Sequence, residues 1–227
     1  MKIAIASTAF LGLASAFAPS ATVVRQSTQL YSGKDEGEMS KALPFVPRPK
    51  MLDGTLAGDV GFDPFNFAGE DMSNLLWMRE AEVKHSRLAM LAVVGWPLAE
   101  LWDKSIADAA GLPSLLTTSG ASPSLLNGGL AKIDPVYWFA VALLAGIVEL
   151  SNADVKEAAG ADYAPGDCGF DPLGLFPADK EGQKQMQTKE LKHGRIAMMA
   201  VLGFVAQEAL YRTPVVNETP FFFHPLF

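Results

Sequence analysis

The chain has 227 residues, 49% of them hydrophobic, and a positive mean hydropathy, which suits one domain that is more apolar than a typical soluble protein. Its formal net charge of −7 provides no basic stripe to neutralise phosphates, so we expect no nucleic-acid partner. The single cysteine, Cys168, excludes an internal disulfide and a Cys-x-x-Cys site.

The N-terminus has the pattern of two targeting signals. An apolar run from Ile3 to Leu13 precedes the small residues Ala14-Ser15-Ala16, and it is too short to span a membrane, so we expect residues 1–16 to be a signal peptide. Residues 17–32 have several hydroxyl side chains and no acidic one, which is typical of a plastid transit segment. Simple secretion would explain the apolar run but not this acid-free stretch. We therefore expect residues 33–227 to form the mature domain.

The mature domain contains an internal repeat. Gly61-Phe62-Asp63-Pro64 recurs as Gly169-Phe170-Asp171-Pro172, an offset of 108 residues (169 − 61 = 108). The same offset relates the stretch EVKHSRLAM, from Glu82 to Met90, to ELKHGRIAM, from Glu190 to Met198. Because the spacing inside both copies is the same, we interpret them as two copies of one structural unit.

Three helices are expected in chain order. Each copy of the repeat has a Gly/Pro-containing loop, a polar helical start and a long apolar stretch, and the segment between the copies opens with the helix-start pair Asp134-Pro135. We predict an all-α membrane protein with three transmembrane helices, at approximately residues 80–103, 135–152 and 188–211. The linker 110–132, rich in Gly, Ser, Thr and Pro, is expected to carry no long element.

Three spans would give the two copies the same orientation in the membrane, because the middle helix returns the chain to its starting side. We therefore expect the first and third helices to form a crossed pair, related by a pseudo-two-fold axis along the membrane normal. With their polar turns, these helices would each run about thirty residues, or about 45 Å, so tilt or protrusion is expected.

The charged motif predicts two ion pairs between these helices. Ionisable residues inside a bilayer are costly and are usually paired or functional. Glu82 and Arg87 are five residues apart, which separates them by about 140° around a helix axis, so one helix cannot easily neutralise its own glutamate. We predict that Glu82 pairs with Arg195 and that Glu190 pairs with Arg87.

This pairing would leave His85, His193 and one oxygen of each motif glutamate available. A lone histidine would be interpreted as a satisfied residue at a membrane interface, but duplication with its neighbours favours a metal ligand. One hypothesis is a membrane di-iron carboxylate oxidoreductase, because Glu-x-x-His on two helices is half of such a site. Glu100 and Glu208 could not complete it, since each lies 18 residues, or about 27 Å, along the same helix from its motif glutamate.

The other hypothesis is one axial bond from each residue to a metal already held by a macrocycle. Magnesium in chlorophyll accepts a further ligand from imidazole or from a hard oxygen atom. A glutamate in this role is best compensated by a positive charge, which the motif arginines would supply. This hypothesis accounts for every residue of the motif.

The two E-x-x-H-x-R-x-A-M motifs, each preceded by GFDP, resemble the light-harvesting chlorophyll a/b- and a/c-binding antenna family over approximately residues 43–211. Within this family the chain most resembles the fucoxanthin chlorophyll a/c type of the red plastid lineage. The resemblance implies these axial ligands of chlorophyll magnesium: Glu82, His85, Glu149, Glu190, His193 and Gln207. It implies carotenoid contacts at Phe62, Asp63, Pro64, Phe170, Asp171, Pro172, Ala89, Gly95, Ala197 and Gly203.

Some of these residues have simpler interpretations. The GFDP loops are also ordinary turns that start a segment, and small helix residues also permit close helix packing without any carotenoid. His224 is expected either to bind a peripheral pigment or to lie in an amphipathic anchor.

The resemblance implies a non-enzymatic, multi-pass protein of the plastid thylakoid membrane that transfers excitation energy to a photosystem. Its expected cofactors are chlorophyll a, chlorophyll c and fucoxanthin or a related carotenoid. Its expected partners are thylakoid lipids, other antenna subunits and the core of photosystem I or II. A pigment-poor stress-response member of the superfamily is a further alternative, against which the additional candidate ligands Glu149 and Gln207 argue.

Overall fold

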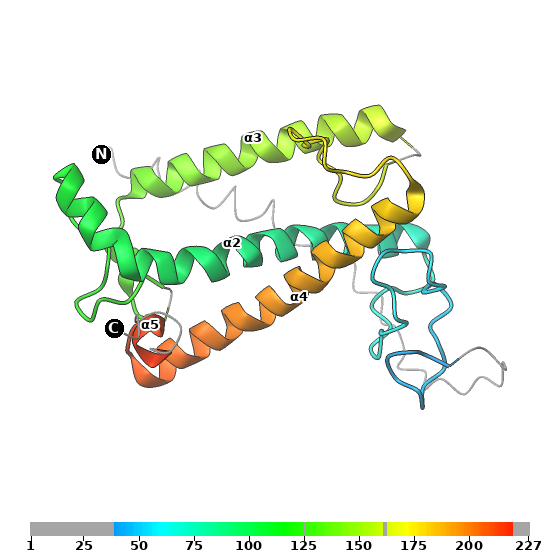
Figure 1. The fold of residues 1–227 in the computed structure, drawn as a ribbon, viewed down its shortest axis with the longest axis horizontal. Coiled ribbons are helices and arrows are strands. Elements are labelled where there is room, and N and C mark those ends of the chain that lie inside the picture. The colour runs from blue at the N-terminus through cyan, green and yellow to red at the C-terminus, as the bar shows by residue number, and fades with distance from the viewer. Residues whose placement is uncertain (1–38, 125, 161–162, 220–227) are drawn as a thin grey trace, which may run out of the picture. The chain divides into compact units, whose positions relative to one another are not determined.

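A computed structural model describes residues 39–124, 126–160 and 163–219 (Figure 1). The signal peptide and transit segment predicted for residues 1–16 and 17–32, and His224, lie outside the described residues. The elements in chain order are α2 (Met72–Ala110), η1 (Gly129–Lys132), α3 (Pro135–Ala159), α4 (Lys180–Tyr211) and α5 (Val215–Glu218). The described part of the chain has no strand beyond one isolated bridge and is mostly helical.

Each of the three long helices begins after an aspartate. The side chains of Asp71, Asp134 and Asp179 accept hydrogen bonds from backbone N–H groups in the first turns of α2, α3 and α4. Such capping satisfies donors that have no partner inside the helix. Pro135 occupies the first position of α3, where its missing N–H costs nothing. Gly111 ends α2 in the left-handed conformation at φ 67°, which favours glycine.

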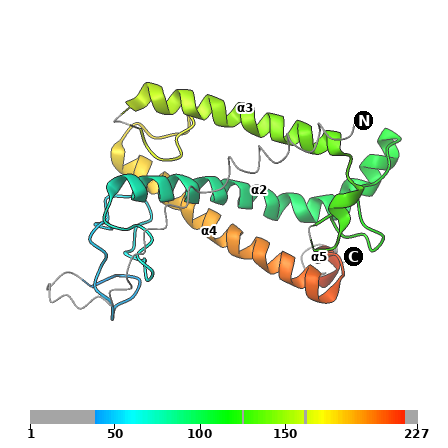
Figure 2. The ribbon, with the colours of Figure 1, turned by 180° about the vertical axis from the view of Figure 1, so that it is seen from behind.

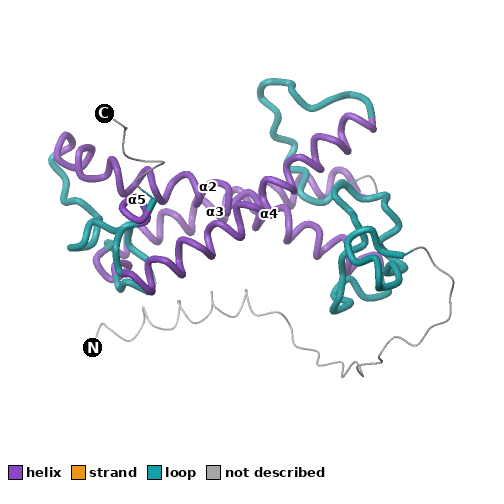
Figure 3. The backbone as a smooth tube through the Cα atoms, turned by 60° about the horizontal axis from the view of Figure 1, so that its bottom comes forward, coloured by secondary structure: helices purple, strands orange, loops and turns teal. Residues whose placement is uncertain are grey.

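The helices α2 and α4 pack closely and cross (Figures 1 and 3). At the crossing, Ser86 of α2 is fully buried against Gly194 of α4, and a Cβ atom added at Gly194 would lie 2.9 Å from the Cα atom of Ser86. Only a glycine permits this approach. Ser86 and Gly194 are equivalent residues of the two repeat copies, so the crossing lies where a two-fold axis between the copies would pass.

The loops that precede α2 and α4 pack against the opposite helix in a matching way. Gly166 has φ 85° and lies so close to Val83 that an added Cβ atom would come within 2.9 Å of the Val83 Cβ atom. In the other copy, Gly58 lies against Leu191, which is 2% exposed. Val83 and Leu191 are again equivalent residues, so the loops also follow the repeat.

The third long helix, α3, lies apart from the crossed pair (Figures 1 and 2). No Cα atom of another described helix lies within 8 Å of a Cα atom of α3, and no residue of α3 is buried. By length and composition α3 could cross a membrane. It is the only described helix that is both long enough and apolar enough to do so. The apolar stretches of α2 and α4 are bordered by charged and polar residues, and three membrane spans remain a prediction.

A short helix that the sequence did not predict, α5, packs against both α2 and α4. Its residues Val215 and Val216 are 0% and 4% exposed. Glu100 of α2 accepts hydrogen bonds from the backbone N–H groups of Val216, at 3.0 Å, and of Ser122 in the linker, at 3.2 Å. The carboxylate therefore connects α2 to both the linker and α5.

Candidate functional site

Two reciprocal ion pairs connect the crossed helices. Arg87 Nε of α2 donates to Glu190 Oε1 of α4 at 2.7 Å, and Arg195 Nε of α4 donates to Glu82 Oε1 of α2 at 2.8 Å. These are the partners that the sequence predicted, and the structure brings all four residues together at the crossing. Each arginine thus neutralises the motif glutamate of the opposite helix.

Each arginine also binds the loop that precedes the opposite helix. Arg87 Nη1 donates to the backbone oxygen of Gly166 at 2.6 Å, and Arg195 Nη1 donates to that of Gly58 at 3.1 Å. No role of these glycines was predicted from the sequence. The sequence contained one indication of such a role, because Gly58 and Gly166 are the same residue at equivalent positions of the two repeat copies.

The two motif glutamates differ in their second oxygen. Glu82 Oε2 accepts a hydrogen bond from Arg79 Nη1 at 3.0 Å, so the expectation that this oxygen has no protein partner is wrong. The corresponding residue of the other copy is Gln187, and Glu190 Oε2 has no hydrogen-bond partner within the described residues. A carboxylate oxygen has more than one lone pair, so Glu82 can accept both the arginine and a metal.

Both motif histidines have the same orientation. His85 Nδ1 lies 2.7 Å from the backbone oxygen of Ala81, and His193 Nδ1 lies 2.8 Å from that of Lys189. Because a carbonyl oxygen only accepts, Nδ1 donates in this contact, and in the neutral imidazole Nε2 then carries the lone pair. Both side chains are exposed. Each histidine and each motif glutamate could therefore give one ligand to a separate metal that approaches from outside the helix pair.

The described residues contain no group of three His, Cys, Asp or Glu side chains placed to hold a metal ion. Such a group is what a di-iron site requires, so the oxidoreductase alternative has no support. Glu208, which is 3% exposed, instead accepts a hydrogen bond from the side-chain amide of Asn127 in the linker. Glu208 therefore connects α4 to the linker, just as Glu100 connects α2 to it.

The GFDP loops are turns with matching hydrogen bonds. Asp63 accepts from the N–H groups of Phe67 and Ala68, and Asp171 accepts from those of Leu175 and Phe176. The bonds from Phe176 and Leu175 lower the pKa of Asp171 from its ordinary value. The aromatic rings and prolines of the motifs point outward and are exposed: Phe62, Pro64, Phe170 and Pro172.

The small helix residues lie in different surroundings. Gly95 lines an apolar groove of about 590 Å³ together with Arg87, Met90, Leu91 and Val94. Gly203 is also open, because a Cβ atom added there would meet no atom within 4 Å. Ala89 is half-buried, and Ala197 is 7% exposed and lies within the helix contact. The two glycines are thus accessible to a ligand, whereas Ala197 is mainly a packing residue.

The remaining candidate ligands lie away from the crossing. Glu149 is an exposed residue of α3, and its Oε2 atom accepts a hydrogen bond from Lys84 Nζ of α2 at 2.7 Å. Gln207 is half-buried in α4, one turn before the helix ends at Tyr211. Neither residue is a hydrogen-bond partner of the arginine–glutamate pairs within the described residues, so each would bind its own metal.

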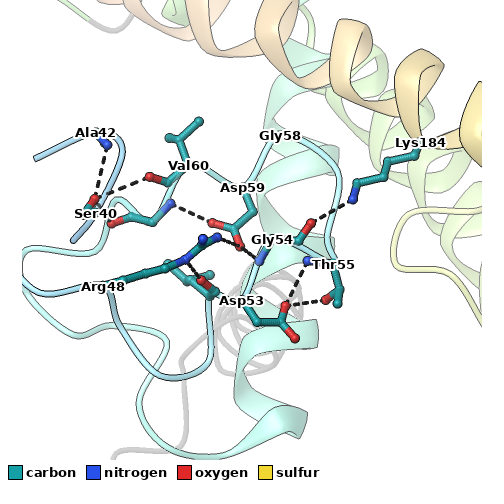
Figure 4. Close-up of polar contacts among 12 residues, drawn as sticks. Ser40, Ala42, Arg48, Asp53, Gly54, Thr55, Gly58, Asp59, Val60 and Lys184 are labelled. Carbon is teal, nitrogen blue, oxygen red and sulfur yellow. Dashed lines mark hydrogen bonds and ion pairs between the residues drawn. The ribbon is translucent and has the colours of Figure 1, made fainter. Parts of the chain in front are cut away.

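Residues of the loop before α2 and of α4 line a polar cavity of about 520 Å³, and Figure 4 shows the polar contacts beside it. Arg48 Nη2 lies 3.2 Å from Asp59 Oδ2, and Lys184 Nζ of α4 donates to the backbone oxygen of Gly54 at 2.7 Å. Asp59 also accepts from the N–H groups of Gly54 and Gly61, each at 2.7 Å. This network holds the first GFDP loop against α4.

Over the described residues, the fold and the duplicated site define a mostly helical protein with exposed histidines, which are candidate metal ligands, on a crossed helix pair. The family model described as "Chlorophyll A-B binding protein" matches residues 48–209, and the chain belongs to this family, which is not enzymatic.

Three curated relatives illustrate the breadth of the family. The chain is 38% identical to the fucoxanthin-chlorophyll a-c binding protein of Isochrysis galbana over 164 residues, 66% of this chain and 72% of that protein. It is 35% identical to light-harvesting complex stress-related protein 3.2 of Chlamydomonas reinhardtii, over 74% of this chain and 67% of that protein. It is 36% identical to chlorophyll a-b binding protein 6 of Arabidopsis thaliana, over 74% of this chain and 68% of that protein.

Proposed function

We propose that this protein is a light-harvesting antenna of the plastid thylakoid membrane, which binds chlorophylls and carotenoids and transfers excitation energy to a photosystem. The observation that carries the proposal is the duplicated site, in which both exposed histidines bond the backbone through Nδ1, have no partner at Nε2 among the described residues, and lie three residues after a glutamate paired with an arginine. Family membership and the names of the relatives support the same function.

The proposed axial ligands are those that the resemblance implied: Glu82, His85, Glu149, Glu190, His193 and Gln207. The bound chlorophylls would supply the absorption of light and the transfer of excitation, and the protein residues would hold them in place. Carbonyl oxygens of the preceding turn set the direction of each imidazole ring, and the arginines lie within ion-pair distance of the motif glutamates. The crossed pair is the rigid frame on which distances between pigments would depend.

The pigments are proposed to be chlorophyll a, chlorophyll c and fucoxanthin or a related carotenoid, which agrees with the name of the Isochrysis galbana relative. The carotenoids would lie along the grooves of the crossed pair, where Gly95 and Gly203 leave room. The exposed rings Phe62 and Phe170 of the two GFDP loops would contact their ends.

The membrane arrangement follows from the same proposal. The helix α3 would be the middle of three spans, with α2 and α4 crossing the bilayer in a tilted orientation. Thylakoid lipids, other antenna subunits and the core of photosystem I or II would surround the protein. A relative named photosystem I chlorophyll a/b-binding protein 5 supports association with a photosystem, without deciding between the two.

Substitution of either motif histidine tests the ligand assignment. We expect His85→Leu and His193→Leu each to lose about one chlorophyll per chain while the fold survives, because leucine offers no lone pair to magnesium. The measurement is pigment extraction with an absorption spectrum on detergent-purified protein, together with an iron assay and circular dichroism.

The matched control is His193→Asn, which retains an oxygen atom that magnesium accepts and should keep the chlorophyll. Unchanged pigment counts in both leucine variants would disprove the histidine ligands. Bound iron in a colourless protein would instead revive the di-iron hypothesis.

A further inference from the structure

Four charged side chains form a ladder between α2 and α3. Lys84 of α2 lies 2.7 Å from Glu149 of α3 and 3.2 Å from Glu80, one turn earlier on its own helix. Glu80 in turn lies 2.9 Å from Lys156 of α3. The charges alternate in sign and sum to zero, so each lysine has a carboxylate on the opposite helix.

Within α3, Glu149 has no cation that could neutralise it. The helix contains a single basic residue, Lys156, two turns farther along, and Lys156 is itself paired with Glu80 and lies 5.2 Å from the ring centre of Tyr163. Positions three and four residues from Glu149 on either side carry no Lys or Arg. The positive charge beside Glu149 therefore comes from α2.

The contacts of Glu149 leave a site for a metal. Lys84 bonds Oε2, and Oε1 accepts no hydrogen bond within the described residues. The side chain is 57% exposed on a helix that makes no close backbone contact with the other described helices. A carboxylate bound to a neutral magnesium macrocycle in a low-dielectric environment carries a net negative charge, which is costly without a nearby cation.

We propose that Lys84 is the charge-compensating residue that makes Glu149 of α3 usable as an axial magnesium ligand. This inference rests on the proposed function, in which Glu149 binds a chlorophyll. The arrangement resembles the crossed pair, where each motif glutamate also takes its cation from another helix. Lys84 acts through Glu149 and is therefore a positioning residue.

The role belongs to one copy of the repeat. Lys192 is the residue equivalent to Lys84, but it lines the polar cavity beside the loop before α2 and forms no ion pair within the described part of the chain. Lys84 and Lys192 are therefore the same residue type at equivalent positions but have different neighbours in the structure.

The test removes the charge of Lys84, the charge of the proposed ligand Glu149, or both. We expect Lys84→Gln to lose about one chlorophyll per chain, because the Glu149 carboxylate is then uncompensated. Glu149→Gln should keep that chlorophyll, since an amide oxygen is a neutral ligand that needs no cation. The double variant Lys84→Gln with Glu149→Gln should therefore also keep it. Pigment is counted after extraction, and thermal unfolding is followed by circular dichroism.

Two controls accompany these variants. Lys84→Arg preserves the charge and should keep the chlorophyll. Lys189→Gln removes an exposed lysine of α4, one turn before His193, that has no ion pair within the described residues, and it should change nothing.

The outcomes separate charge compensation from a purely structural ion pair. If Glu149→Gln and the double variant both lose the chlorophyll, the pair acts only by holding α3, and the proposal is overturned. A full pigment count in Lys84→Gln overturns it as well. If Glu149→Leu keeps every chlorophyll, Glu149 is no ligand and the inference falls with that assignment, whereas the histidine variants still report on the antenna function.

Discussion

Replacing Gly194 with alanine is expected to push α2 and α4 apart at their crossing and to lower the stability of the protein. The new Cβ atom would lie 2.9 Å from the Cα atom of Ser86, which is backbone and cannot move without shifting the whole helix. Overpacking of this kind costs about 1–3 kcal/mol, and the gain in helix propensity of about 1 kcal/mol offsets only part of it. Thermal unfolding of the purified protein measures the difference.

Two further variants make this prediction specific. The exchange Ser86→Gly with Gly194→Ala keeps one glycine at the contact and should restore most of the stability. Gly146→Ala in α3, where an added Cβ atom meets no atom within 4 Å, changes helix propensity alone and should not destabilise the protein. Stability of Gly194→Ala equal to that of the unmodified protein would show that the helices do not cross at this residue.

Replacing Arg87 with leucine is expected to lower both stability and pigment content. The variant loses the 2.7 Å pair with Glu190 and the hydrogen bond to the Gly166 carbonyl, and it leaves the glutamate unpaired. Removing one partner of a buried pair costs about 3–5 kcal/mol. The side chains of Arg87 and Glu190 are 38% and 32% exposed, which places the expected loss at the lower end of this range.

The equivalent change on the other helix should be milder. Arg195→Leu removes the pair with Glu82, but Arg79 still lies 3.0 Å from that glutamate and keeps it compensated. The second copy has Gln187 at the position of Arg79 and offers no such cation. Denaturant unfolding and pigment extraction of both variants provide the comparison. Equal losses would mean that Arg79 contributes nothing to the compensation of Glu82.

A third variant isolates the unpaired charge. Arg87→Leu combined with Glu190→Gln removes the uncompensated carboxylate and should recover part of the stability lost in Arg87→Leu alone. Failure to recover would indicate that the loop contact of Arg87, rather than its charge, carries the effect.

The repeat made the crossed pair predictable from sequence. Because both copies carry the same charges at the same spacing, a single geometric argument, the angle between Glu82 and Arg87 on one helix, led to both interhelix pairs. Helix positions followed from the apolar runs and, for α3, from the Asp134-Pro135 pair. The helices α2 and α4 begin eight residues before the predicted spans, at Met72 and Lys180, and α2 and α3 end seven residues after them, at Ala110 and Ala159.

The contacts that break the repeat were not predictable in this way. The bond from Arg79 to Glu82 occurs in one copy only, and the ladder from Lys84 to Glu149 joins helices that the repeat does not relate. Glu100 and Glu208 were considered only as unsuitable metal ligands, whereas they bind the linker and α5. Spacing along one helix says nothing about the distant segments that fold back against it.

The contact between Ser86 and Gly194 has a consequence for how the two halves of the chain can diverge. Several other contacts between the halves join non-equivalent positions, such as Val83 with Gly166 and Leu191 with Gly58. At the crossing, a residue faces its own counterpart, and the space holds one serine and one glycine. A second serine, taken from the first half, would not fit. The two halves therefore cannot be interchanged at this point, and any substitution in one is constrained by the other.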